Sequence, residues 1–351
     1  MTIRLAGDLT ASALKRVAPR IRSVLRVEGT HRLLWELNAL RRVDLGGRRA
    51  LRELQREAYM TRFRSAYVAR RPRTRGVALW IAHTTPDEFA RPFPTIDQAV
   101  DWLQHDRERL DPQGSSAVAS PRAAWLLRDY SRRLTLIERA ARAAFGELFS
   151  RIVGSPQHEI VDEQIRTLGV RGLVSLLQFT GALSKQLQAR FGPTNSQFLI
   201  SLSALMGGCG YCGYGHALAG ALSEFKETGR LHPLHPGSLT ELYDLEDDEI
   251  KRRLDALLSA AAHARLRRHV RSMYELFLGE LEAETEEDLL LLSVLETWRW
   301  TIECTIIRGV GIEPEDAWPV SPLGADKRLV ARYLQARAAA RAAGSGRQHG
   351  L

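Results

Sequence analysis

The sequence predicts an all-α fold. Across most of its 351 residues, apolar side chains recur three and four positions apart, which is the spacing of one buried helix face. Residues that begin and end helices, such as threonine, serine, proline and glycine, flank these segments. Only Gly76–His83 has the apolar run of a β-strand, and a single strand has no partner with which to form a sheet. We therefore expect this segment to be an extended connection.

Residues 1–120 form the first predicted region, a basic and mostly helical N-terminal extension. Its predicted helices are Thr10–Leu25, which Pro19 interrupts, Thr30–Val43, Gly46–Arg71 and Thr95–Leu110. The run DPQGSSAVASP at 111–121 is rich in turn-forming residues and indicates a linker. No motif in this region points to a chemical role.

Residues 121–320 should form a second helical domain, followed by a C-terminal helix and tail at 321–351. Gly229 is expected to end the helix that carries the cysteines, and a capping box of Thr285 and Asp288 is expected to begin a later one. The predicted helices are Pro121–Gly154, Gln157–Phe191, one opened by Gly192–Ser196, Cys209–Thr228, two within Leu245–Leu278, Thr285–Arg308 and Ala325–Ala343.

Composition and charge are those of an ordinary globular protein. The net charge of +9 comes mainly from arginines that are interleaved with periodic apolar residues, as on a solvated helix face, so nucleic-acid binding is not expected. Three cysteines do not form a disulfide framework, and they favour a reducing compartment. No apolar run has the length of a signal-peptide core or a membrane span. We expect a cytoplasmic protein without a membrane partner.

Two cysteines and a histidine lie within eight residues of one another. Cys209, Cys212 and His216 have helical spacing, so a helix that begins near Cys209 directs all three into one small volume. The positive end of the helix dipole and a neighbouring histidine both lower the pKa of a thiol. Cys212 is therefore the candidate nucleophile, and Cys209 is placed to attack the adduct and close a disulfide.

The motif CGYCGYGH resembles the alkylhydroperoxidase D-like and carboxymuconolactone decarboxylase-like families. The apolar run from Phe198 to Met206 and the turn at 207–208 also match the family pattern. The pattern places a glutamate twelve residues before the first cysteine, and this chain has Gln197 there. The resemblance implies a helical domain that forms trimers or hexamers. It also implies that Cys212 is the peroxidatic thiol, Cys209 the resolving thiol and His216 the base of a proton relay.

Several other interpretations of the cysteines compete with this one. Zinc could bind Cys209, Cys212 and His216, although no fourth ligand is nearby in the sequence. A c-type haem needs histidine directly after the second cysteine, where Gly213 stands, and a thioredoxin-like motif needs flanking strands. Buried, inert cysteines are a further alternative, but the many glycines around the motif favour a close approach by a neighbouring helix or a ligand. Cys304 is expected to be such a buried structural thiol.

These observations predict a thiol-dependent peroxidase or disulfide reductase. Its substrate would be a hydroperoxide or a disulfide, and an external dithiol would restore the reduced pair. No pattern for a metal, flavin or nicotinamide cofactor is visible. The alternative is a non-catalytic helical scaffold or a redox-sensing regulatory protein whose basic N-terminal region binds a partner. The family's acid-base branch is a third possibility, but its members generally lack the cysteine pair.

Overall fold

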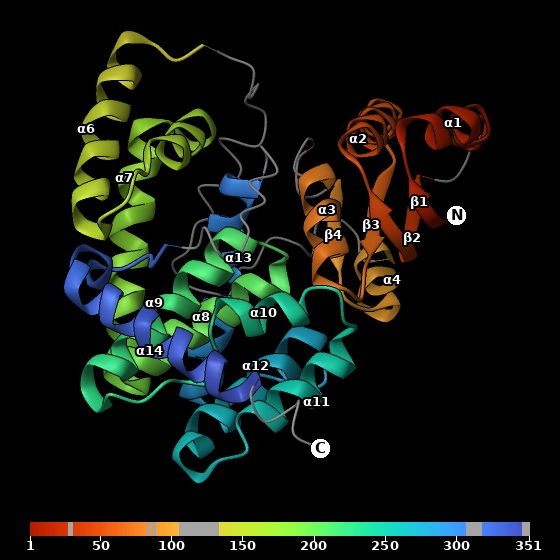
Figure 1. Ribbon diagram of the computed structural model, residues 1–351. Helices are drawn as coiled ribbons and strands as arrows, with labels where there is room; N and C mark the ends of the chain where they lie inside the picture. Colours follow the sequence, from red (N-terminus) through yellow and green to blue (C-terminus); the bar gives the residue numbers. More distant parts are fainter. Residues whose placement is uncertain (27–30, 83–84, 86–88, 105–132, 307–317, 346–351) are drawn as a thin grey trace.

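The computed structural model describes residues 1–26, 31–82, 85, 89–104, 133–306 and 318–345. These residues form two parts. The first is an N-terminal unit that contains a β-sheet, and the second is a larger helical body (Figure 1). The protein is mostly helical, as predicted, but the prediction of an all-α fold is wrong for the N-terminal unit. The predicted linker at 111–121 lies outside the described residues.

The N-terminal unit alternates strands with helices around a parallel sheet. Its four described strands are hydrogen-bonded in the order β1-β2-β3-β4, with every neighbouring pair parallel. Helix α4 packs on one face of the sheet through Trp102 and Leu103, and α1, α2 and α3 cover the other face. The elements are β1 (Thr2–Leu9), α1 (Ala11–Leu25), β2 (Arg32–Val43), α2 (Leu45–Met60), β3 (Arg64–Val68), α3 (Pro72–Ala82), β4 (Ala90–Phe93) and α4 (Ile96–Gln104).

Three of the predicted elements in this unit are wrong. The segment Thr30–Val43 contains strand β2 rather than a helix, and Gly46–Arg71 contains helix α2 followed by strand β3. The segment Gly76–His83, the one strand-like run, was expected to be an extended connection, but it lies largely within helix α3. In each case the cause is burial of the element on more than one face. A parallel strand that is buried on both faces shows no alternation of apolar and polar residues, and a helix that is buried all round shows no polar stripe, so the sequence pattern does not distinguish them.

The helical body agrees with the prediction more closely. Gly229 ends α9 in a left-handed conformation, and the Thr285–Asp288 capping box precedes α13, so both predictions are confirmed. The region predicted as two helices also contains the short 3₁₀ helix η2. The elements are α6 (Leu136–Val153), α7 (His158–Phe191, kinked at Gly169), α8 (Pro193–Gly207), α9 (Gly210–Thr228), α10 (Pro236–Leu242), α11 (Asp247–Leu257), η2 (Ala261–His263), α12 (Ala264–Leu278), α13 (Glu286–Ile306), η4 (Pro322–Ala325) and α14 (Lys327–Ser345).

Helix α3 joins the two parts of the molecule. Its Gly76 lies against the backbone of Gly208, where a Cβ on Gly76 would be only 2.5 Å from the Gly208 carbonyl oxygen. Directly before Gly76, the buried Arg75 guanidinium forms two hydrogen bonds with Asp247 of the helical body, at 2.8 and 3.0 Å. Arg75 also donates to the backbone oxygen of Met206. The N-terminal unit therefore rests directly on the turn that precedes the cysteine pair.

Candidate functional site

The two cysteines lie at the start of helix α9, which packs against α8 in an antiparallel hairpin. The turn between these helices requires Gly208, whose φ of 81° is in the left-handed region. Cys209 follows in an extended conformation and is the N-cap of α9. Its sulfur accepts a hydrogen bond from the backbone N–H of Cys212 at 3.5 Å. The predicted helix thus begins where the sequence indicated, with the first cysteine capping it.

Both cysteines are thiols rather than a disulfide, and both are buried. Cys209 is 3% exposed and Cys212 is 5% exposed. At the N-terminus of α9 the Cys209 sulfur accepts from the backbone N–H of Cys212 and lies at the positive end of the helix dipole, and both stabilise a thiolate. The N-cap position thus favours ionisation of Cys209 as well as of Cys212, which the sequence singled out.

His216 is held by the residue that replaces the expected glutamate. Nδ1 of His216 lies 2.8 Å from Oε1 of Gln197 on α8. Because a carbonyl oxygen only accepts hydrogen bonds, Nδ1 carries the ring proton and Nε2 is left as the basic nitrogen. Burial lowers the pKa of His216 to about 4, so the ring is neutral near pH 7. Gln197 therefore orients the imidazole but supplies no charge to stabilise its protonated form.

Two tyrosines border the thiols, although no pattern in the sequence predicts a role for either. Tyr211 donates a hydrogen bond to Oε1 of Gln157 at 2.5 Å, which ties the CxxC turn to the start of α7. Tyr243, at the end of α10, is buried against the same turn. Burial raises the pKa of both phenols, and the negative charge that either thiol gains on ionising raises it further. Both hydroxyls therefore stay protonated at neutral pH.

Two glycines of α9, Gly215 within the motif and Gly220 four residues beyond it, permit a close approach by other parts of the chain. A Cβ on Gly220 would lie 2.9 Å from the ring of Phe198, so the α8–α9 contact depends on its absence. On another side of α9, Gly215 accepts a backbone hydrogen bond from Val320 at 3.3 Å. These contacts come from a neighbouring helix and the segment before η4, so the close approach serves packing.

No group of three or more histidine, cysteine and acidic side chains in the described part of the chain has the arrangement of a metal site, and this includes Cys209, Cys212 and His216. The Cys304 side chain lies outside the described residues, so its prediction as a buried structural thiol stays a prediction.

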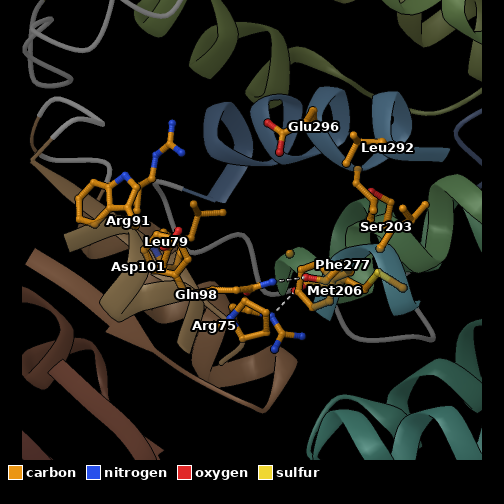
Figure 2. A pocket seen from close by; sticks show the side chains of 17 residues that line it. Arg75, Leu79, Arg91, Gln98, Asp101, Ser203, Met206, Phe277, Leu292 and Glu296 are labelled. Carbon is orange, nitrogen blue, oxygen red and sulfur yellow. Dashed lines mark hydrogen bonds between the residues drawn. The ribbon is translucent and has the colours of Figure 1, made fainter. Parts of the chain in front are cut away.

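A pocket of about 510 Å³ lies where the N-terminal unit meets the helical body (Figure 2). Figure 2 shows Arg91 and Asp101 on its N-terminal side and Glu296 on its helical side. Ser203 and Met206 of α8 line it, but Gln197, Cys209, Cys212 and His216 do not. The pocket and the thiols are therefore separate features.

Comparisons of the chain with family models, curated proteins and solved structures gave no match. The resemblance to alkylhydroperoxidase D-like proteins consequently stays a prediction from the motif. Among the helices that the structure describes, none combines the length and apolar character needed to cross a membrane.

Proposed function

We propose that this protein is a thiol-dependent peroxidase or disulfide reductase that uses Cys212, Cys209 and His216. The hydrogen bond between His216 and Gln197 at 2.8 Å carries the proposal, because it leaves Nε2 of a neutral imidazole as a base on the helix that bears both thiols. The resemblance of CxxCxxxH to alkylhydroperoxidase D-like proteins supports the same chemistry.

In the proposed cycle, His216 Nε2 takes the thiol proton of Cys212. The thiolate attacks the terminal oxygen of a hydroperoxide, the O–O bond breaks, and Cys212 becomes a sulfenic acid. The leaving alkoxide takes the proton from His216 and departs as an alcohol. Cys209 then attacks the Cys212 sulfur, the S–S bond forms and the S–O bond breaks, and water leaves. An external dithiol reduces the disulfide through thiol–disulfide exchange.

The burial of both thiols restricts the substrate. With Cys209 and Cys212 at most 5% exposed, a folded protein disulfide cannot reach either sulfur without a rearrangement of the site. A small hydroperoxide needs much less space. Within the proposed function, burial therefore favours hydroperoxide over disulfide as the oxidising substrate.

Mass spectrometry of the reduced protein before and after a stoichiometric dose of hydrogen peroxide tests the proposal. We expect loss of two hydrogens, mapped to a peptide in which Cys209 and Cys212 are joined. An unchanged mass, or oxidation spread over cysteine and methionine residues without this link, would contradict it. Zinc bound at one per chain would instead support the metal-site alternative.

One observation favours the regulatory alternative, in which the pair senses oxidants without turning over. The N-terminal unit contacts Gly208 through Gly76, directly before Cys209, so oxidation of the pair would act on an interface between two parts of the molecule. A sensor would form the disulfide once and change its protease susceptibility within the N-terminal unit. Sustained peroxide consumption with excess dithiothreitol would favour the enzyme instead.

A further inference from the structure

The positive charge of the chain is concentrated in its N-terminal unit. Residues 1–75 contain 19 lysines and arginines and 6 aspartates and glutamates, a net charge of +13. The other 276 residues contain 31 and 35 of these residues, a net charge of −4. All of the 19 except Lys15 are arginines, whose planar guanidinium matches two oxygens of a phosphate. A charge divided this unevenly indicates a surface for an anionic partner.

Helices α1 and α2 lie side by side and run parallel to each other. At their starts, a Cβ on Gly46 would lie only 2.9 Å from the Cβ of Ala11, and near their ends Arg22 forms an ion pair with Glu57 at 2.7 Å. Both contacts join residues that are 35 positions apart, so the helices are in register along their length. Helix α3 lies between α2 and the helical body (Figure 1). The sides of α1 and α2 that face away from the sheet therefore form one surface.

Cations dominate this surface. Arg16 on α1, and Arg49 and Arg56 on α2, are exposed and lie opposite the buried residues of their helices. Among the described residues Arg16 and Arg49 have no ion-pair partner, whereas Arg56 shares Glu53 with Arg52. Burial lowers the pKa of the Arg52 guanidinium, and the charges of Arg56 and Arg49 lower it further. The cations thus crowd one another with few acids to neutralise them.

We call this surface the α1–α2 face and define it by its exposed cations. They are Lys15, Arg16, Arg20, Arg49 and Arg56.

The surface around these cations lacks the groups that would favour a membrane or unpaired bases. Val17 is 42% exposed on α1, and the other exposed large apolar residues, Leu45 and Met60, stand at opposite ends of α2, so they form no contiguous apolar patch. Tyr59 is the only aromatic residue of these two helices, and it packs edge-on against Phe89 with centroids 4.9 Å apart. It therefore offers no platform on which bases could stack.

We propose that the α1–α2 face binds the phosphate backbone of a nucleic-acid duplex without reading its sequence. Arginine contacts to phosphates fix the position of a protein on a duplex, whereas sequence is read at the base edges. From the sequence alone these arginines are expected on separate solvated helix faces. The structure places two such faces next to each other, so their charges act together on one partner. The inference is independent of the dithiol cycle, because none of the five cations lies on α8 or α9.

Fluorescence anisotropy of a labelled DNA duplex of about 20 base pairs, titrated with the full chain at about 50 to 200 mM salt, tests the proposal. We expect a dissociation constant on the order of 10⁻⁶ M at the lowest salt, and a logarithm of affinity that falls linearly with the logarithm of salt concentration. Replacing Arg16, Arg49 and Arg56 together by glutamine should weaken binding about tenfold or more. It should also lower the salt slope by about 2 to 3, because each phosphate contact contributes about 0.9.

A matched variant separates the face from the overall charge. Replacing Arg139, Arg171 and Arg328 by glutamine removes the same charge from exposed positions of the helical body, and these three have no ion-pair partner among the described residues. This variant should keep the parent's affinity and slope, and thermal melting followed by circular dichroism shows that both variants are folded. Equal weakening in the two variants, or no binding at the lowest salt, would overturn the inference.

Two further probes distinguish the anion. Vesicles that contain phosphatidylserine should bind the chain more weakly than the duplex does, and polyglutamate should compete poorly with the duplex. Tighter binding to the vesicles would overturn the inference in favour of a membrane surface. Efficient displacement of the duplex by polyglutamate would overturn it in favour of an acidic protein.

Discussion

Replacing Gln197 by glutamate should increase the rate of peroxide reduction by about tenfold or more. The Gln197 oxygen lies 2.8 Å from Nδ1 of His216, so a glutamate brings a carboxylate oxygen to the same N–H. A hydrogen bond to a charged group contributes about 1.5–3 kcal/mol and a neutral one about 0.5–1.5 kcal/mol, so protonated His216 gains roughly 1–1.5 kcal/mol. That gain corresponds to about one pKa unit.

The sign of this change favours catalysis. Burial lowers the pKa of His216 to about 4. A carboxylate next to the ring would raise this pKa again, because it stabilises the protonated ring. His216 takes the proton of Cys212 on the way to the thiolate, so the gain applies to the transition state, at about tenfold in rate per 1.36 kcal/mol. Gln197 is only partly buried, so a carboxylate there can also exchange its proton with solvent.

The assay is hydrogen peroxide consumption with dithiothreitol as reductant, measured across pH. Gln197→Glu should raise the rate and add an acid limb to the pH profile, because the new carboxylate must be ionised to act. Gln178→Glu adds the same charge at an exposed position of α7 and serves as the control. If Gln197→Glu leaves the rate flat while Cys212→Ser abolishes it, the relay runs through another group. If neither variant changes the rate, the non-catalytic alternative is favoured.

Three further predictions follow from the same contacts. Cys212→Ser should abolish peroxide consumption and Cys209→Ser should leave a sulfenic acid that accumulates; faster alkylation of Cys209 than of Cys212 would reverse these roles. Asp247→Asn should destabilise the protein by about 3–5 kcal/mol in urea unfolding, because it leaves the Arg75 charge buried, whereas Asp244→Asn, which breaks an exposed pair with Arg73, should cost less than about 1 kcal/mol. Equal losses would show that burial is not the cause. Gly76→Ala should speed alkylation of Cys209, because the added methyl group forces α3 away from the turn. Gly181→Ala is the control, because Gly181 has open space around it. Equal alkylation rates in the two variants would mean that the contact between Gly76 and Gly208 does not protect the thiol.

The sequence was most informative where local signals act. Helix α9 was predicted closely because Cys209 caps it and Gly229 ends it, and both signals are properties of adjacent residues. Strand β2 was missed because Leu33, Leu34 and Trp35 are all buried, one side of the sheet being covered by α4 and the other by α1 to α3. A strand that is buried on both faces lacks the alternation of apolar and polar residues that would distinguish it from a helix.

The same reasoning explains which site residues could be predicted. Cys209, Cys212 and His216 are neighbours on one helix, and Gln197 has a fixed spacing from them on the preceding helix, so a pattern in the sequence contains all four. Tyr243 reaches the turn from α10, and Gln157 reaches it from the start of α7. These approaches depend on how distant helices pack, and no local spacing encodes them.

The buried Arg75 has a consequence for the time scale on which the thiols meet reagents. Its guanidinium donates two hydrogen bonds to Asp247 and one to the backbone oxygen of Met206, so separating α3 from the turn breaks several buried hydrogen bonds at once. Such an opening should be rare and all-or-none rather than a gradual loosening. Alkylation of Cys209 from this side would then reach a limiting rate at high reagent concentration, set by the opening itself. A rate that keeps rising in proportion to reagent would show that the thiol is reached by another route.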